Sequence, residues 1–310
     1  NGNYHSHKAL ERELAEFYDL PHAMVFSTGY GANLGILTAL LQPGDCVLLD
    51  ADAHASLYDG CKMSGADSYR FKHNDPDSLE ARLRRLGDRA TRTLIVVEGL
   101  YSIIGDCAPL QKFAEIKRRY GAYLLIDEAH SLGIYGDNGR GLVEAQGITE
   151  EADFIVGTFS KSLGSTGGFC VSQHEILSLM RYTSRPFIFT ASACPSVIAT
   201  TRAALQVMRD RTELRTQLWK NAHQLYAGLQ GLGLSTGPEV SPVVGVRCAD
   251  QEQAINAWHR LLAAGVYTNL IVPPASPDGS SLLRCSMSAA HTSAQVDAII
   301  AAFEAVLVTN

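Results

Sequence analysis

The fold of this chain is decided by the stretch Leu124-Leu125-Ile126-Asp127-Glu128-Ala129-His130, an apolar run that ends in polar side chains. A short run of large aliphatic residues without polar alternation is typical of a central strand in a parallel sheet, because both faces of such a sheet are buried. Ligands of open α/β sheets bind at the carboxyl ends of these strands. We therefore expect Asp127 and His130 to lie at a binding site.

Comparable strand-like runs recur through the first part of the chain, and helical patterns fall between most of them. The runs cover residues 23–26, 46–49, 68–71, 93–97, 123–126, 153–156 and 168–171. This alternation predicts an α/β fold, a mainly parallel sheet sandwiched by helices.

The pattern changes near residue 190. A helical stretch over residues 195–232, strand-like runs at 243–248 and 282–287, and helices at 251–264 and from residue 293 predict a smaller α+β domain. We therefore expect a large domain over residues 1–189 and a small C-terminal domain over residues 190–310.

A second informative stretch is Gly157-Thr158-Phe159-Ser160-Lys161-Ser162-Leu163-Gly164, which follows a strand-like run. A lone lysine is usually a solvated surface charge, but one beside hydroxyls and glycines suits a Schiff base to a phosphorylated aldehyde, pyridoxal 5′-phosphate (PLP). PLP stores electrons only while its ring nitrogen stays protonated, and a buried carboxylate such as Asp127 maintains that state. His130 is spaced to reach the phenolic oxygen of PLP.

A candidate phosphate cradle precedes the helical pattern at residues 32–41. The turn Ser27-Thr28-Gly29-Tyr30-Gly31 leads into that pattern, so backbone amides at a helix start are offered to an anion. The same residues are also compatible with an ordinary strand-to-helix turn.

Composition excludes several classes of function. The net charge of −6 and the lack of a basic run argue against a nucleic-acid partner. The seven cysteines are odd in number and widely spaced, which suggests reduced packing residues in a cytoplasmic protein. No cysteine or histidine spacing indicates a metal site, and no stretch of the sequence is apolar over the length needed to span a bilayer. We expect no signal peptide within residues 1–310, and targeting elements upstream of Asn1 are left open.

Five motifs together identify a family resemblance. They are VFSTGY at residues 25–30, DADAHAS at 50–56, DEAHS at 127–131, GTFSKS at 157–162 and SAAHT at 288–292. These motifs resemble those of the α-oxoamine synthases, which are fold-type I PLP-dependent transferases, and the resemblance spans nearly the whole chain. Residues 58–61, 185–192 and 282–286 are most similar to family members that use L-serine.

The resemblance implies a role for each matching position. Lys161 would form the imine with PLP, Asp127 would pair with the ring nitrogen and His130 would contact the phenolic oxygen. His54 would stack on the ring and orient the substrate, although a histidine at a loop-to-helix junction is more often a cap. The phosphate would be held or flanked by Gly29, Tyr30, Thr158 and Ser160, and in a homodimer also by Thr190 of the other subunit. Arg284 would bind the substrate carboxylate, a task suited to its bidentate fork.

The implied reaction is a decarboxylative Claisen-type condensation. An amino acid, with L-serine favoured, would react with a long-chain acyl-CoA such as palmitoyl-CoA and give 3-oxosphinganine, CoA and CO2, the first step of sphingolipid synthesis. Such fatty molecules would favour contact with a membrane surface. Val272 stands where serine-using relatives often have an arginine before Pro-Pro, and the family's N-terminal segment is missing from this chain. Relatives that use alanine or glycine, a carrier-protein acyl donor and a non-catalytic subunit therefore remain alternatives.

Overall fold

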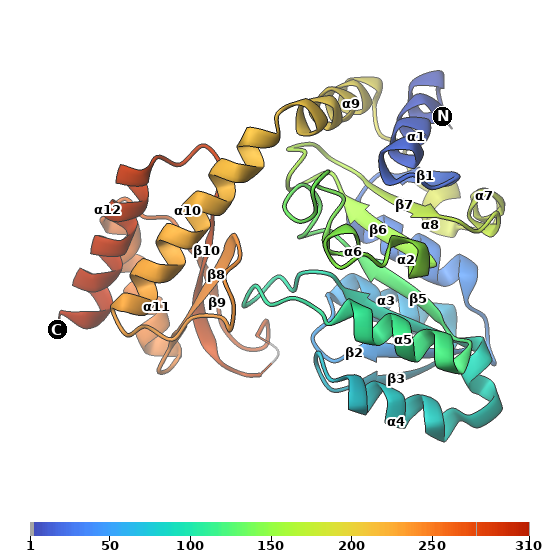
Figure 1. Cartoon of the computed structure of the whole chain (residues 1–310), viewed down its shortest axis with the longest axis horizontal. Helices are drawn as coiled ribbons and strands as arrows, with labels where there is room; N and C mark the ends of the chain where they lie inside the picture. Colours follow the sequence, from blue (N-terminus) through green and yellow to red (C-terminus); the bar gives the residue numbers. More distant parts are fainter. Residues whose placement is uncertain (1–2, 277, 310) are drawn as a thin grey trace. The chain divides into compact units, whose positions relative to one another are not determined.

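The computed structural model describes residues 3–276 and 278–309 and divides into two compact units (Figure 1). The first unit contains the chain up to Leu100 together with Cys107–Asp210. The second contains Tyr101–Asp106 together with the chain from Arg211 onward. The predicted domain boundary at residues 189 and 190 falls within the first unit, just after the short helix α8, Arg185–Ile188.

The first unit is built on a seven-stranded sheet with the order β1-β7-β6-β5-β4-β2-β3. Strands β3, β2, β4, β5 and β6 pair in parallel, whereas β7 is antiparallel to both of its neighbours, β6 and β1. The strands are β1 His22–Phe26, β2 Cys46–Asp50, β3 Asp67–Phe71, β4 Thr93–Glu98, β5 Tyr123–Asp127, β6 Phe154–Thr158 and β7 Gly168–Ser172. The predicted α/β fold with a mainly parallel sheet is confirmed.

The reversal at β7 follows from the length of its connection to β6. Only nine residues, 159–167, separate the two strands. A parallel neighbour needs a crossover of a dozen or more residues, so this short connection forces the antiparallel direction. It also holds Lys161 at the carboxyl end of β6.

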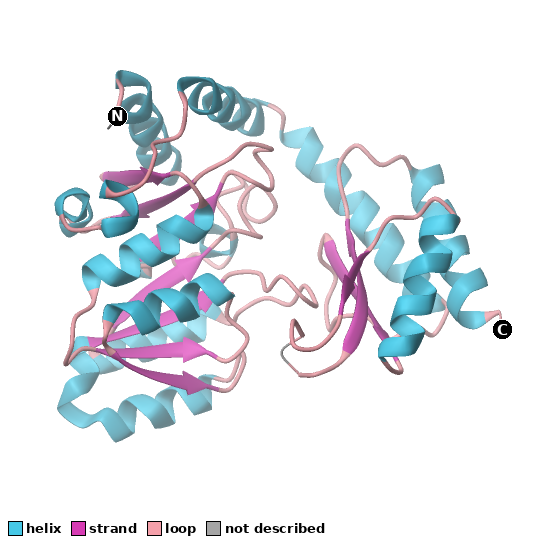
Figure 2. Cartoon of the chain, turned by 180° about the vertical axis from the view of Figure 1, so that it is seen from behind, coloured by secondary structure: helices cyan, strands magenta, loops and turns pink. Residues whose placement is uncertain are grey.

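Helices pack against this sheet on both of its faces (Figure 2). The longer helices of this unit are α1 His5–Tyr18, α2 Gly29–Leu40, α3 Ala55–Ser64, α4 Pro76–Leu86, α5 Leu110–Tyr120 and α9 Pro195–Asp210, the last of which packs against α1. Short helices are α6 Leu142–Ala145, α7 Ile176–Leu179 and α8, with 3-10 turns at Gly87–Arg92, Thr149–Glu151 and Met180–Tyr182. The inner face of α1, formed by Leu10, Leu14, Phe17 and Tyr18, is buried.

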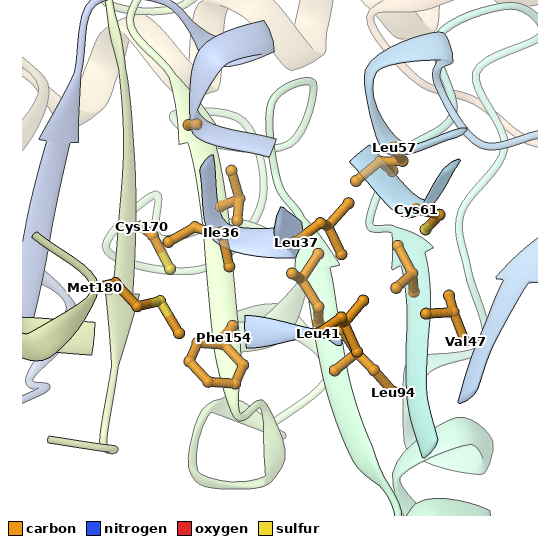
Figure 3. Packing of buried hydrophobic residues seen from close by; sticks show 14 of the residues in the cluster. Ile36, Leu37, Leu41, Val47, Leu57, Cys61, Leu94, Phe154, Cys170 and Met180 are labelled. Carbon is orange, nitrogen blue, oxygen red and sulfur yellow. The ribbon is translucent and has the colours of Figure 1, made fainter. Parts of the chain in front are cut away.

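The two faces of the sheet alternate along each strand. Leu94 and Val96 of β4 belong to a hydrophobic cluster with Ile36 and Leu37 of α2, and Figure 3 shows Leu94 beside these two α2 residues. The intervening Ile95 is also fully buried but lies outside this cluster, since successive side chains of a strand point to opposite faces. Burial on both faces explains why these strands are continuously apolar. The alternation also fixes which polar residues at the strand ends face α2.

The second unit is an α+β arrangement, as predicted. Its three-stranded antiparallel sheet has the order β8-β10-β9, with strands β8 Val243–Cys248, β9 Asn269–Ile271 and β10 Ser281–Ser286. Its helices are α10 Thr212–Gly231, α11 Gln251–Ala263 and α12 Ser293–Phe303, followed by a π-helical turn at Glu304–Val308. The helical stretch expected over residues 195–232 is present as two helices, because Arg211 leaves the helical conformation between α9 and α10.

The loop Tyr101–Asp106 belongs to the second unit although it leaves from the first unit's sheet. Gly105 has a φ of +76°, and an added Cβ would stand only 2.0 Å from the carbonyl oxygen of Val243. Glycine is therefore required where this loop contacts β8. None of the helices formed by residues 3–276 and 278–309 has the length and apolar content that crossing a bilayer requires.

Candidate active site

A cavity of about 280 Å³ lies in the first unit where the parallel strands end. It gathers eight of the ten predicted site residues: Gly29, Tyr30, His54, Asp127, His130, Thr158, Ser160 and Lys161. Asn33, Ser56 and Glu98 also line it. The prediction that these sequence-distant residues share one site agrees with the rule that ligands bind at the carboxyl edge of such sheets.

Strand alternation aims three polar side chains at this cavity. Leu94 and Val96 of β4 and Leu125 of β5 pack in the cluster under α2. Every second side chain of a strand lies on the same face, so Glu98 of β4 and Asp127 of β5 also lie on the face covered by α2. Glu98 and Asp127 are also directly opposite one another in the parallel register. Thr158, the last residue of β6, faces the same way. All three side chains are nearly inaccessible to solvent.

The start of α2 forms one wall of the cavity. Thr28 caps the helix, since its hydroxyl accepts a hydrogen bond from the Gly31 amide at 2.8 Å. Helix α2 then packs so closely against β6 that a Cβ added to Gly29 would lie 2.8 Å from Thr158 Cβ and Oγ1. Glycine at this position therefore permits the close approach of helix start and strand end.

The Asp127 carboxylate is held from two sides. Its Oδ1 accepts from the Ala129 amide at 2.9 Å, and its Oδ2 accepts from Asn33 Nδ2 at 2.7 Å. The same Asn33 nitrogen lies 2.9 Å from Ser56 Oγ, and this oxygen lies 2.7 Å from His54 Nδ1. A hydrogen-bonded connection thus runs from β5 through α2 to the start of α3.

His54 is both a helix cap and a cavity residue. Its ring accepts from the Ser56 amide at 3.2 Å as the N-cap of α3, so the capping alternative is confirmed and does not exclude its place in the cavity. Its backbone amide donates to Glu98 Oε1 at 2.5 Å. Burial and the nearby Asp127 charge raise the pKa of Glu98 well above its usual value, which favours a protonated, neutral carboxylic acid.

The connection between β6 and β7 presents hydroxyls beside Lys161. The Thr158 hydroxyl donates to the Gly167 carbonyl at 3.0 Å and lies 2.9 Å from Ser160 Oγ. Ser160 and Lys161 are exposed on the cavity side of this segment. The Lys161 amine and the Ser160 hydroxyl are therefore accessible next to Thr158, which is buried and hydrogen-bonded.

His130 is positioned by the loop that follows β5. The neighbouring Glu128 is buried and accepts from the amides of Leu142 and Val143 at 3.0 and 2.7 Å, as well as from the Ser131 hydroxyl. Burial raises the pKa of Glu128 to about 8. This carboxyl closes the loop on itself and fixes the segment that carries His130.

Two predicted residues lie outside the cavity. Thr190 is exposed in the first unit, beyond α8. Arg284 belongs to β10 of the second unit, where its Nη1 donates to the Ser102 carbonyl at 3.0 Å and its Nη2 to Asn269 Oδ1 at 3.1 Å. Burial lowers the pKa of Arg284, and its Nε is buried without a hydrogen-bond partner among the described residues.

Sequence reasoning missed three polar residues of the site. Glu98 could have been found, because it ends a strand that neighbours the Asp127 strand. Asn33 lies one helical turn beyond Gly29, on the same face of α2, so the cradle prediction contained its signal. Ser56 was quoted only within a motif, and no local pattern indicates its contact with a residue on another helix.

Comparison with known proteins agrees with this geometry. The family model for aminotransferase class I and II matches residues 1–303. The chain belongs to the aminotransferase class I and II family. It is 57% identical over 300 residues to a serine palmitoyltransferase from Caulobacter vibrioides, covering 97% of this chain and 74% of that protein.

Two further relatives define its place in that family. A solved serine palmitoyltransferase from S. paucimobilis with bound PLP–myriocin aldimine superposes with a TM-score of 0.96 and 47% identity, covering 99% of this chain and 77% of that one. An 8-amino-7-oxononanoate synthase from Anaeromyxobacter dehalogenans is 38% identical, covering 99% of this chain and 76% of that protein. The expected resemblance to the α-oxoamine synthases, and among them to the serine palmitoyltransferases, is confirmed.

Proposed function

We propose that this protein is a PLP-dependent acyltransferase that condenses L-serine with a long-chain acyl-CoA, with palmitoyl-CoA favoured. The products are 3-oxosphinganine, CoA and CO2, which makes the reaction the first step of sphingolipid synthesis. The observation that carries the proposal is the single cavity that joins Lys161, Asp127, His54 and His130 to the start of α2. The similarity to proteins named serine palmitoyltransferase, at 57% and 47% identity, supports the choice of reaction.

The residues of the cavity fit PLP chemically. An amine for the aldehyde, a buried carboxylate for the ring nitrogen and a capped helix start for the phosphate are all present. The helix start can approach β6 only because Gly29 lacks a Cβ. We assign the phosphate to the α2 amides at Gly29 and Tyr30 and to the hydroxyls of Thr158 and Ser160.

The protein's own groups hold the reacting atoms and move one proton. PLP, when bound, stabilises negative charge that develops at the α-carbon of the amino acid. Asp127 Oδ1 and Oδ2 would keep a proton on the ring nitrogen, while the His54 ring would stack on the cofactor and His130 would contact its phenolic oxygen. Lys161 Nζ would hold the aldehyde carbon and, once displaced by the substrate amine, take the proton from the α-carbon.

Arg284 is proposed to bind the carboxylate of the amino acid. Among the described residues its guanidinium contacts only neutral acceptors, Ser102 O and Asn269 Oδ1, and no carboxylate pairs with it. A half-buried positive charge without an anionic partner is costly, and a substrate carboxylate would supply that partner. The unused Nε–H offers a further donor.

We also propose that the protein is a homodimer in which Thr190 of one subunit reaches the phosphate in the other. Large apolar side chains are exposed on the segment just before Thr190, with Leu179 at 54%, Tyr182 at 80% and Phe189 at 71% exposure. Such a cluster marks an interaction surface. A second copy of the chain would cover it and complete the phosphate site.

The cytoplasm is the proposed location. All seven cysteines are free thiols, and Cys46, Cys61, Cys170 and Cys285 are buried. Unpaired cysteines used as packing residues are typical of proteins from a reducing compartment. The fatty substrate and product favour transient contact with a membrane surface.

A product assay with a panel of substrates tests the reaction. Protein loaded with PLP is incubated with palmitoyl-CoA and L-serine, L-alanine or glycine, and products are identified by mass spectrometry, with Lys161→Ala as the inactive control. We expect 3-oxosphinganine from L-serine, at a kcat/KM above that of either rival. Preference for L-alanine or glycine would instead assign the chain to a sibling synthase, and no product with any of them would indicate a non-catalytic subunit.

A further inference from the structure

We propose that Asn33 is a positioning residue that couples the carboxylate of Asp127 to the ring of His54 through the hydroxyl of Ser56. The inference rests on the proposed function, because it assigns Asp127 and His54 to the two groups that hold the PLP ring. It adds Asn33 of α2 and Ser56 of α3, which line the same cavity.

The geometry uses both hydrogens of one amide group. Asn33 Nδ2 lies 2.7 Å from Asp127 Oδ2 and 2.9 Å from Ser56 Oγ. An Asn amide nitrogen carries two hydrogens and no acceptor, so each contact takes one hydrogen. The Asn33 amide orientation is therefore fixed by two partners on two other elements.

The direction of the remaining bonds sets the state of the His54 ring. The Ser56 backbone amide can only donate, so His54 Nδ1, 3.2 Å away, is an acceptor without a proton. Because Ser56 Oγ already accepts from Asn33, its own hydrogen is free to donate to His54 Nδ1 at 2.7 Å. Neutral His54 is thereby held as the tautomer with hydrogen on Nε2, the nitrogen that remains for contact with a ligand.

Burial makes this arrangement rigid. Asn33 is 3% exposed, Ser56 1% and Asp127 5%. Bulk solvent hardly reaches these side chains, and losing one partner would leave a buried polar atom unpaired. Since α2 also begins at the phosphate cradle, Asn33 links the phosphate end, the ring-nitrogen carboxylate and the ring-stacking histidine.

Three variants separate this role from a merely structural one. Asn33→Asp keeps the shape of the side chain but replaces both donated hydrogens with an oxygen that repels Asp127. Ser56→Ala removes only the connection to His54. Asn221→Asp is the matched control, because Asn221 is fully buried in the second unit and its Nδ2 also donates two hydrogen bonds, to Ser288 O and His291 O.

The measurements are the dissociation constants for PLP and then for L-serine, by absorbance, together with the thermal midpoint of each apoprotein. We expect Asn33→Asp to bind PLP about tenfold more weakly or worse, as the loss of a hydrogen bond to a charged group implies. Ser56→Ala should bind PLP within about threefold of wild type but L-serine several-fold more weakly, because only His54 is released. Asn221→Asp should lower the midpoint without changing PLP affinity.

A nitrogen-15 NMR spectrum of histidine-labelled wild-type apoprotein tests the tautomer without any variant and applies even if Asn33→Asp fails to fold. Hydrogen on His54 Nε2 supports the proposal, whereas hydrogen on Nδ1 overturns it. PLP affinity in Asn33→Asp equal to wild type would also overturn it. Wild-type protein that binds no PLP would contradict the proposed function instead, and the tautomer measurement would still stand.

Discussion

Replacing Gly29 with alanine should weaken cofactor binding through one steric contact. The new methyl group would stand 2.8 Å from both Cβ and Oγ1 of Thr158. Carbon atoms in contact are normally separated by about 3.5 to 4.0 Å, so the helix start and the strand end must move apart by roughly 1 Å. Thr158 cannot rotate away freely, since its hydroxyl is bound to Gly167 O at 3.0 Å and lies 2.9 Å from Ser160 Oγ.

The expected magnitude follows from that displacement. Overpacking of this kind costs about 1 to 3 kcal/mol of unfolding free energy, partly offset by up to about 1 kcal/mol from the better helix propensity of alanine. A misplacement of about 1 Å at the groups that hold a ligand can cost on the order of a hundredfold in rate. We therefore expect Gly29→Ala to lower the thermal midpoint of the apoprotein modestly and to weaken PLP binding by at least about tenfold.

The assay is absorbance titration of apoprotein with PLP alongside thermal unfolding. The control is Gly231→Ala at the end of α10, where an added Cβ meets nothing within 4 Å and the helix propensity gain is similar. This control should keep its PLP affinity, and its midpoint should not fall but rise slightly with the gain in helix propensity. If Gly29→Ala bound PLP as tightly as wild type, the close approach of α2 to β6 would not be part of the phosphate cradle.

Three further variants test separate parts of the account. Glu128 has a pKa of about 8 in the folded protein, so between about pH 5 and pH 8 the folded state retains a proton that the unfolded chain releases. The free energy of unfolding should therefore fall as the pH rises through this range, by at most about 1.4 kcal/mol per pH unit. Urea unfolding of Glu128→Gln should show a flatter profile over that range, and an unchanged slope would contradict the assignment. Arg284→Lys should raise the KM for L-serine about tenfold or more while leaving the PLP absorbance spectrum unchanged, since a lysine cannot reproduce the bidentate fork; an unaltered KM would remove Arg284 from the substrate site. Replacing Tyr182 and Phe189 together with serine should convert dimers to monomers in sedimentation experiments, whereas Tyr267→Ser, which alters an equally exposed ring of the second unit, should not.

Most strands of the large sheet were predictable because they are short, apolar and separated from the next by turn residues; the edge strand β3, Asp67–Phe71, is the polar and largely exposed exception. The predicted run at residues 93–97 became β4, Thr93–Glu98, and the run at 123–126 became β5, Tyr123–Asp127. In both cases the structure adds the polar residue that follows the apolar run. Those added residues, Glu98 and Asp127, face the cavity, so the polar residue that ends an apolar strand carries the signal for the site.

Features that depend on pairing between distant segments were not predictable. Strand β9, Asn269–Ile271, has three residues and exists only through its pairing with β10, and no local pattern distinguishes it from a loop. The break at Arg211 lacks a glycine or proline to announce it and coincides with the division between the units. The loop Tyr101–Asp106 likewise joins the second unit through contacts that lie far away in the sequence.

The same distinction applies to the site. Lys161, Asp127 and His130 were predicted as site residues because their residue types and spacing match a demanding chemistry, and the structure places all three in one cavity. Asn33 and Ser56 act through hydrogen bonds between α2, α3 and β5, and such contacts appear only once the elements are packed. A buried amide in an otherwise apolar helix nevertheless needs partners, so Asn33 in the run Ala32-Asn33-Leu34 was a usable signal.

The most direct test of the central claim is to find which residue holds the cofactor. Protein loaded with PLP is reduced with borohydride, digested and analysed by mass spectrometry, with Lys161→Ala treated in parallel. The account predicts a pyridoxyl-phosphate adduct on the peptide that contains Lys161, and none on that peptide in the variant. An adduct confined to another lysine, or no adduct in the wild-type protein, would contradict it.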